Sequence, residues 1–339
     1  METQLRKADF DSIKDAAALM KKGEVVGIPT ETVYGIAANS FDADAIKKIF
    51  IAKNRPQDNP LIVHISDMDM LHEVVSYVSE DAKKMMAAFW PGALTIIMPK
   101  SERVPLETTA GLDSVGVRMP SHPVAHQLIC ACGFPFSAPS ANRSGRPSPT
   151  TAQDVFEDMN GRIPLILDGG ESFAGVESTV ISVLGETPVI LRPGVVTKEM
   201  IEHVLGKKIL VSKAITHQLE QGEKALSPGM KYKHYAPNAE ITILVGSFEI
   251  FKEYVESRKD DAVFCLCFDG EETKLNLPCI TYGKQNDPDA QAHLLFSALR
   301  ELDKAGAKIV YARCPGKDGV SLAVYNRLIR AAGFRVVTL

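Results

Sequence analysis

The sequence lacks the patterns that mark disulfide-rich, zinc-binding or membrane-spanning proteins. Its six cysteines, at positions 130, 132, 265, 267, 279 and 314, form two C-x-C pairs and no C-x-x-C. Both pairs lie in apolar runs, so we expect buried free thiols rather than zinc ligands or disulfides. No apolar run approaches the roughly 18 residues that span a bilayer, and the N-terminal METQLRKADFDSI lacks the apolar core of a signal peptide. We expect a cytoplasmic protein without a membrane segment.

The chain also lacks an excess of positive charge and the common catalytic patterns. Its 38 Lys and Arg residues face 42 acidic residues, for a net charge of -4. This balance gives no general attraction to nucleic acid or anionic membrane, so an anion site requires a local cluster of basic residues. We find neither paired carboxylates nor a Ser-His-Asp pattern, and no G-x-G-x-x-G or P-loop in the second half.

What remains is an ordinary globular composition, 45% hydrophobic and 24% charged, in 339 residues. At roughly 100–200 residues per domain, this length indicates two domains. In residues 1–210, strands outnumber helices and alternate with them irregularly, which predicts an α/β domain with a twisted mixed sheet and flanking helices. Thr151 and Thr197 are expected to cap short helices. The expected strands are 24–29, 61–65, 93–99, 115–120, 135–140, 164–168, 178–184 and 189–193.

The last part of the chain, residues 239–339, has a more regular alternation of strands and helices. It predicts a smaller Rossmann-like α/β domain, interpreted as accessory. Residues 211–238 are expected to link the two domains. This segment contains SPGMKYKHYAP (227–237), which carries more aromatic and basic residues than a plain tether.

Polar motifs follow the predicted strands of the first domain. PTETVYG (29–35) places hydroxyl groups directly after a buried strand, with a capped turn into a helix as the alternative interpretation. KNRPQDNPLIVH (53–64) places basic residues on a loop that prolines keep from being helical, which suits phosphate oxygens. SAPSANRSGRPSPT (137–150) is polar enough to line a nucleotide pocket or to be a surface loop. Together the loops supply the cations Lys53, Arg55, Arg118, Arg143, Arg146 and Arg192.

Two residues within apolar strands allow opposite interpretations. Arg118, in SVGVRMP (114–120), needs an anion if it is buried, either a protein carboxylate or a substrate carboxylate. His64, in LIVHI, is either a satisfied core residue or part of the site. A pocket rich in cations and hydroxyls, without a covalent nucleophile, suits chemistry by positioning and charge stabilisation, as in nucleotidyl transfer.

The motifs PTETVYG, K-x-R-P with a downstream P-L-x-x-H, SVGVRMP, SAPSAN, ESTV and LRPG occur here in this order. Together they resemble the YrdC-like family, over roughly residues 22–237, and SPGMKYKHYAP resembles the linker of its two-domain members, the threonylcarbamoyl-AMP synthases. The resemblance implies that L-threonine, bicarbonate and ATP are converted to L-threonylcarbamoyl-adenylate and pyrophosphate. Partner proteins then transfer the threonylcarbamoyl group to an adenosine beside the tRNA anticodon.

The resemblance also implies the site residues. Those for L-threonine are Thr32, His64, Arg118, Ala138 and Ser178. Those for ATP are Lys53, Arg55, Asn59, Ser114, Ser140, Ser148 and Arg192, with Lys53 near the phosphates. We add the hypothesis that His234 or Tyr235 of the linker contacts ATP. ATP is a substrate, and Mg²⁺ is expected to be held mainly by its phosphates.

An easily hydrolysed adenylate needs protection from water, so we expect the segment 227–237 to close over the pocket. Two rival functions stay open at this point. One is a carbamoyl-adenylate enzyme of the hydrogenase-maturation type, although the chain has no room for that family's extra segments. The other is a non-catalytic module for double-stranded RNA, against which the acidic net charge argues. Weak contact with tRNA is left open.

Overall fold

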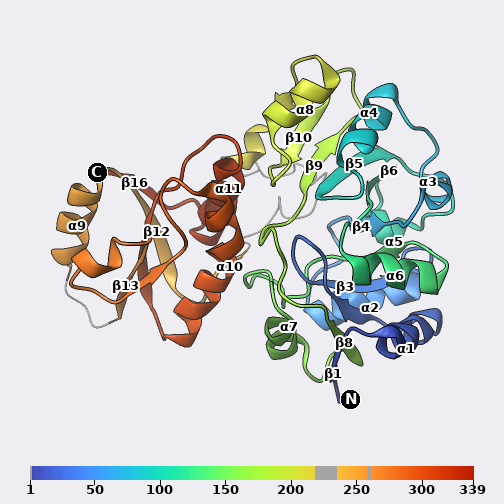
Figure 1. The fold of residues 1–339 in the computed structure, drawn as a ribbon, viewed down its shortest axis with the longest axis horizontal. Coiled ribbons are helices and arrows are strands. Elements are labelled where there is room, and N and C mark those ends of the chain that lie inside the picture. The colour runs from blue at the N-terminus through green and yellow to red at the C-terminus, as the bar shows by residue number, and fades with distance from the viewer. Residues whose placement is uncertain (1, 218–234, 259–261) are drawn as a thin grey trace.

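The computed structural model describes residues 2–217, 235–258 and 262–339. Within these ranges the chain forms a large domain, which holds the N-terminus, and a smaller one, which holds the C-terminus (Figure 1). The large domain is built on a mixed sheet and the small domain on a parallel one, so the predicted fold class is confirmed.

The large sheet has eleven strands among the described residues, and both parallel and antiparallel neighbours occur. In order across the sheet they are β1 (Gln4–Lys7), β8 (Leu165–Asp168), β2 (Val26–Ile28), β3 (Gly35–Asn39), β7 (Phe136–Ser137), β4 (Ile62–His64), β6 (Ser114–Arg118), β5 (Leu94–Pro99), β9 (Thr179–Ser182), β10 (Val189–Arg192) and β11 (Leu210–Val211). The helices around it are α1 (Phe10–Lys21), α2 (Ala43–Lys53), α3 (Met68–Val74), α4 (Glu80–Phe89), α5 (Leu106–Thr109), α6 (Pro123–Cys132), α7 (Ala152–Met159) and α8 (Lys198–Leu205), with the short 3₁₀ helix η1 (Lys213–Ile215).

Helix α1 shows how the sequence fixes local structure. The Asp9 carboxylate accepts a hydrogen bond from the backbone N–H of Ser12, which satisfies one of the free donors at the helix start. Ile13, Ala17 and Met20 share one face and are buried in a core cluster with residues of α6. The expected caps Thr151 and Thr197 are confirmed at α7 and α8.

The sequence prediction missed β1, β3 and β11. After PTETVYG the chain enters β3, antiparallel to β2, so the alternative of a turn into a helix is wrong. β3 reads GIAAN and has a single β-branched residue, which explains why composition did not reveal it. Since β11 pairs with β10, the large sheet ends at Val211, one residue beyond the expected boundary.

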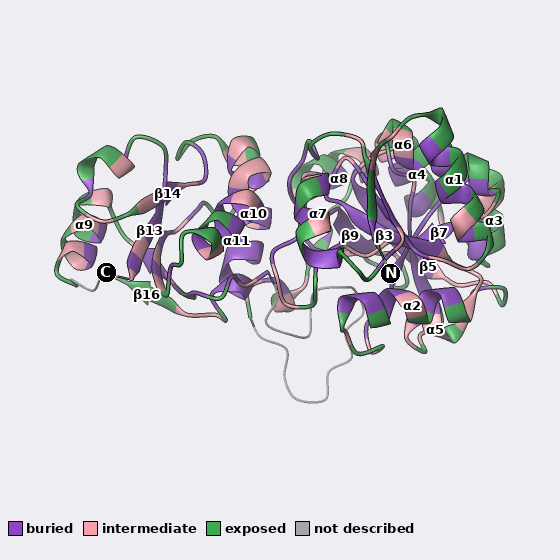
Figure 2. Cartoon of the chain, turned by 90° about the horizontal axis from the view of Figure 1, so that it is seen from below, coloured by how far each residue is buried: buried purple, intermediate pink, exposed green. Residues whose placement is uncertain are grey.

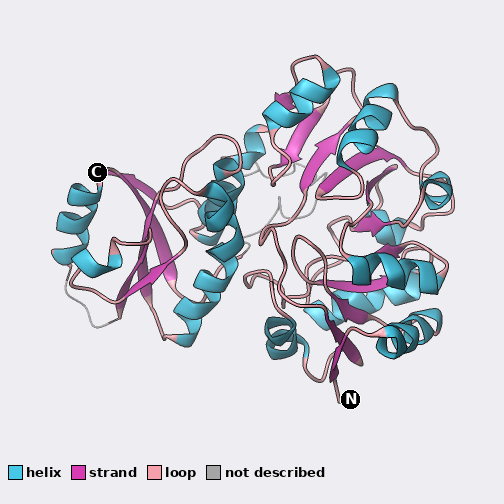
Figure 3. Ribbon diagram, viewed as in Figure 1, coloured by secondary structure: helices cyan, strands magenta, loops and turns pink. Residues whose placement is uncertain are grey.

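The small domain has a five-stranded sheet in which every pairing is parallel. In order its strands are β14 (Cys279–Thr281), β13 (Val263–Cys267), β15 (Ile309–Arg313), β12 (Glu240–Val245) and β16 (Val336–Thr338). Its helices are α9 (Phe248–Glu256), α10 (Pro288–Lys304) and α11 (Ser321–Ala331), with the 3₁₀ turn η2 (Glu272–Lys274). Strand β15 lies between β12 and β13, which departs from the regular doubly wound order. Figure 3 shows helices on both faces, with α10 and α11 on the face toward the large domain.

The two domains share an apolar interface. Val33 and Val176 of the large domain belong to the same buried cluster as the residues between the small sheet and α10 and α11, and Figure 2 shows the buried faces of these helices. Gly175 has a φ of +70°, and a Cβ there would lie 2.3 Å from the Cα of His293 on α10. Only glycine allows the two backbones to approach this closely.

Within the described ranges, no helix combines the length and the apolar character needed to cross a membrane.

Candidate active site

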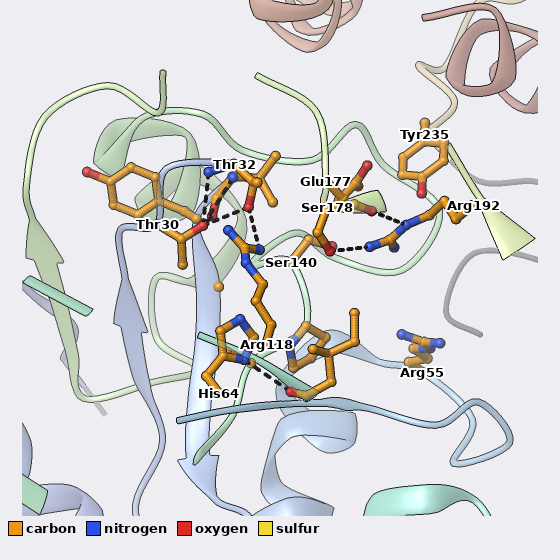
Figure 4. Close-up of a pocket in the computed structure, with 16 residues that line it drawn as sticks. Thr30, Thr32, Arg55, His64, Arg118, Ser140, Glu177, Ser178, Arg192 and Tyr235 are labelled. Carbon is orange, nitrogen blue, oxygen red and sulfur yellow. Dashed lines mark hydrogen bonds between the residues drawn. The ribbon is translucent and has the colours of Figure 1, made fainter. Parts of the chain in front are cut away.

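The loops that follow the central strands converge on one pocket of the large domain (Figure 4). It has an empty volume of about 570 Å³ and opens to solvent. All six motifs that the sequence analysis found in order contribute to its wall, together with Tyr235 of the segment 227–237. The lining residues are Thr30, Thr32, Val33, Tyr34, Gly35, Arg55, Ile62, His64, Arg118, Ala138, Pro139, Ser140, Glu177, Ser178, Arg192 and Tyr235.

His64 and Arg118 lie side by side because they end adjacent parallel strands, β4 and β6, and are register partners. Arg118 donates from Nη1 to Thr32 Oγ1 over 2.9 Å and from Nε to the Gly92 carbonyl over 3.2 Å. Its Nη2 lies 2.6 Å from Oε1 of Glu31, and only 4% of the Arg118 side chain is exposed. The strand register therefore fixes both side chains before any ligand arrives.

The predicted anion of Arg118 is thus present within the protein, as Glu31. Burial raises the pKa of Glu31, but the charge of Arg118 and a hydrogen bond from it outweigh that effect and lower the pKa. This contact fits the structural interpretation of Arg118. It does not exclude the substrate interpretation, because Arg118 also lines the pocket.

His64 is held as a neutral ring. Its Nδ1 lies 3.1 Å from the Ile62 carbonyl, so Nδ1 carries the proton and Nε2 is left as an acceptor. Its ring also stacks on Phe136 with centroids 5.8 Å apart. Burial, and next the charge of Arg118, lower the pKa of His64 to about 3.

A second group of cations and hydroxyls lies across the pocket. Arg192 donates from Nε to the Ser178 carbonyl over 3.1 Å and from Nη2 to Ser178 Oγ over 3.2 Å. Ser178 Oγ is also 2.8 Å from Thr95 Oγ1. Tyr235 is buried, with a φ of +66°, and lines the pocket beside Arg192 (Figure 4).

Lys53 does not reach the pocket. It is the last residue of α2 rather than part of the following loop, and its side chain is buried. Its Nζ donates to the carbonyls of Ser140 and Asn142, the latter over 2.7 Å. Burial, and next the charge of Arg55, lower its pKa. Lys53 therefore supports the SAPSAN loop, and its place near a phosphate stays a prediction.

Three other expected ATP residues lie just outside the lining. Ser148 Oγ donates to Glu177 Oε1 over 2.6 Å, directly behind the wall. Asn59 is buried and bonds Asp58 over 3.3 Å. Ser114 lines a smaller neighbouring hollow, which shares Ile62 with the main pocket.

The remaining cations from the sequence prediction are used elsewhere. Arg146 pairs with Asp158 over 2.6 Å and lies 3.7 Å from Asp303 of α10, so it joins the two domains. Arg143 is exposed and does not line the pocket. His234, like most of 211–238, lies outside the described residues.

Sequence reasoning missed two carboxylates, Glu31 and Glu177. Both lie within motifs of the sequence analysis, PTETVYG and ESTV. They could have been found by asking which acidic residues within the motifs balance the charge of buried arginines. Glu31 also lines a second, wider hollow between the domains, whose other acidic residues are Asp287 and Asp289.

The two carboxylates that line or border the pocket are engaged, Glu31 with Arg118 and Glu177 with Ser148 and Arg327. Among the described residues, no group of three His, Cys, Asp or Glu side chains is arranged to hold a metal.

Comparisons with known proteins show the family of the chain. Residues 18–194 match the Sua5/yciO/yrdC family model, described as Telomere recombination, and residues 196–333 match the family model described as Threonylcarbamoyl-AMP synthase, C-terminal domain. A threonylcarbamoyl-AMP synthase of Bacillus subtilis is 46% identical over 334 residues, covering 96% of this chain and 94% of that protein.

Two solved structures of Pyrococcus abyssi Sua5 are similar over nearly the whole chain. One, complexed with L-threonine, has a TM-score of 0.89 at 40% identity and covers 100% of this chain and 99% of the other. The other carries the substitutions H234A and Y235A and has a TM-score of 0.92 at 38% identity, covering 99% and 98%. The chain therefore belongs to the threonylcarbamoyl-AMP synthase family.

Proposed function

We propose that this chain condenses L-threonine, bicarbonate and ATP into L-threonylcarbamoyl-adenylate and pyrophosphate. One observation carries the proposal: Arg118, at the end of β6, and Arg55, in the loop after α2, line the same pocket. In Figure 4, Thr32, His64 and Arg118 lie on one side, called the threonine side below. Arg55, Arg192 and Tyr235 lie on the other, called the nucleotide side, and Ser178 lies between them.

On the threonine side, Arg118 would bind the carboxylate of L-threonine. Its guanidinium would either contact this carboxylate and Glu31 together or release Glu31 when threonine binds. Thr32 Oγ1 already accepts from Arg118 and lies 2.9 Å from Thr30 Oγ1, so its position is fixed. His64 offers a neutral Nε2 as an acceptor. With a pKa of about 3 it is a hydrogen-bonding group at neutral pH, not a general base. Ala138, through its backbone, and Ser178 complete this side.

On the nucleotide side, Arg55, Ser140, Arg192 and Tyr235 would bind ATP. The threonine amine and bicarbonate form a carbamate with loss of water. A carbamate oxygen then attacks the α-phosphorus, the bond from phosphorus to the bridging oxygen breaks, and pyrophosphate leaves. Arginines fixed by protein contacts stabilise the charge that develops on the phosphates without reorganising. Magnesium bound to the phosphates would add to this stabilisation.

The product suggests the cellular role. A mixed anhydride of a carbamate and AMP is an activated acyl donor, which suits transfer of the threonylcarbamoyl group to tRNA adenosine by partner proteins. The role proposed for this chain is to supply that donor in the cytoplasm. The net charge of -4 argues against tight binding of RNA by this chain alone.

The test is pyrophosphate release by the purified full-length chain. We expect release to require ATP, L-threonine and bicarbonate together, and mass spectrometry to detect the adenylate. Omission of each substrate in turn provides the control. Pyrophosphate release that ignores threonine or bicarbonate would contradict the proposal.

A further inference from the structure

Arg327 is an arginine of the small domain that points into the wall of the large domain's pocket. It lies on α11, its side chain is 0% exposed, and it heads the ranking of fully buried side chains by volume. A buried guanidinium loses its hydration, so its contacts must compensate for that loss. Its hydrogen-bond partners are Glu177, Pro193 and Asn326, and none of these lies in the sheet of the small domain.

Bonds from Arg327 join two loops of the large domain, and a further one runs from Nη1 to Oδ1 of its neighbour Asn326 over 2.9 Å. Nε donates to Glu177 Oε2 over 2.8 Å, and Nη2 donates to the Glu177 carbonyl over 3.2 Å. Nη1 donates to the Pro193 carbonyl over 2.8 Å. One side chain thus binds the residue directly before Ser178 and the residue directly after Arg192. Arg327 therefore fixes the spacing of these two loops from behind.

The joined loops carry the pocket wall. Glu177 lines the pocket, and its second carboxylate oxygen accepts from Ser148. Arg192 in turn bonds the carbonyl and hydroxyl of Ser178. Gly194 completes the close packing, since a Cβ there would lie 2.4 Å from the backbone nitrogen of Thr179. A small shift of either loop would move both Ser178 and Arg192.

Arg327 also lies close to Tyr235, another residue of the nucleotide side. Its Cζ is 5.8 Å from the ring centroid of Tyr235, and that ring packs against Phe296 of α10 with centroids 5.2 Å apart. Burial raises the pKa of Glu177, but the charges of Arg327 and then Arg192 lower it to about 2, so the carboxylate stays ionised. Charge, hydrogen bonds and packing all connect this one residue to the pocket.

We propose that Arg327 is a positioning residue for ATP, through which the small domain completes the nucleotide side of the pocket. The inference rests on the proposed function for the identity of the nucleotide. It gives the small domain, interpreted from sequence as accessory, a direct part in substrate binding.

The experiment compares three substitutions in the full-length chain. R327M removes the guanidinium that joins the loops. R300M removes a second buried arginine at the domain interface, which bonds the Pro147 carbonyl over 2.7 Å and Asp158 over 2.9 Å but is not part of the pocket lining. R313M removes a buried arginine that bonds Glu271 and the Gly246 carbonyl within the small domain. The readouts are the Kd of a non-hydrolysable ATP analogue, the KM values for ATP and threonine, and the melting temperature.

We expect R327M to weaken analogue binding and raise the ATP KM by tenfold or more, with a smaller change in the threonine KM. R300M and R313M are expected to lower the melting temperature while the ATP KM stays within about threefold of the wild-type value. A purely structural role of Arg327 predicts instead a lower melting temperature with both KM values unchanged, and that result would overturn the proposal. So would an equal rise of the ATP KM in R300M.

If R327M does not fold, a second substitution removes the charge of Glu177, which R327M leaves buried without its ion-pair partner. R327M/E177Q is compared with E177Q alone, in which Arg327 still binds both loop carbonyls. We expect the double variant to bind the analogue at least tenfold more weakly than E177Q, and equal binding refutes the positioning role. A wild-type chain that does not bind the analogue would contradict the proposed function itself, which is a separate outcome.

Discussion

On the threonine side of the pocket, His64 and Arg118 end two adjacent parallel strands and are aligned by the register of the sheet. On the nucleotide side, Arg55 lies in a loop, and Arg192 and Tyr235 depend on contacts with a second domain. The first arrangement is fixed by the sheet core, whereas the second is assembled from parts distant in the chain. One pocket thus combines a rigid half with a half whose geometry depends on domain packing.

The strongest test of the rigid half is Arg118→Met. The variant loses the proposed threonine carboxylate ligand and leaves Glu31 without its ion-pair partner. Since truncating one member of a buried charge pair costs about 2–5 kcal/mol, we expect kcat/KM for threonine to fall roughly 30- to 5,000-fold. The assay is pyrophosphate release at saturating ATP.

A matched control is Arg103→Met, which removes an exposed arginine paired with Glu73 on the surface. Exposed pairs contribute about 0–1 kcal/mol, so kinetics and stability should change little. Wild-type threonine kinetics in Arg118→Met would show that the arginine is only a structural partner of Glu31.

Arg55→Met addresses the assembled half. Arg55 is half-buried and stacks near Phe50, with 5.9 Å from its Cζ to the ring centroid. A charge-assisted hydrogen bond contributes about 1.5–3 kcal/mol, so we expect the ATP KM to rise roughly 10- to 100-fold. Threonine binding measured without ATP should be unchanged, and a parallel loss of threonine affinity would contradict the division into two sides.

The same division explains what the sequence could and could not predict. Most central strands were found because buried apolar runs end at prolines and polar loops. The polar motifs at the strand ends were visible in the same way, but the roles of their residues came from the resemblance to the family. Lys53 was misplaced because α2 continues through it, so its charge serves the carbonyls of the SAPSAN loop. The partners Glu177 and Arg327 are 150 positions apart, and no local pattern connects them.

Discrimination between threonine and serine tests how closely the rigid half fits its substrate. The two amino acids differ by one methyl group, for which a pocket gains only about 1–3 kcal/mol, or roughly 10- to 200-fold. We expect serine to give detectable adenylate at a kcat/KM lower by that factor. Mass spectrometry of parallel reactions measures the ratio, and complete exclusion of serine would require more than a simple fit of the methyl group.

The smallest effect concerns the acid stability of the threonine side. Because the pKa of His64 falls from 6.5 to about 3 on folding, the unfolded chain binds more protons than the native one between these values. Stability contributed by the neutral ring is complete above pH 6.5 and is lost as the pH falls toward 3, by up to roughly 1.4 kcal/mol per pH unit. Urea unfolding of the wild type and of His64→Gln at pH 7.5 and 5.5 measures it. We expect the wild type to lose more stability than the variant between the two pH values. An equal loss would mean that His64 takes up a proton in the native state between these pH values, so that its Nε2 could accept a hydrogen bond from threonine only at the higher pH.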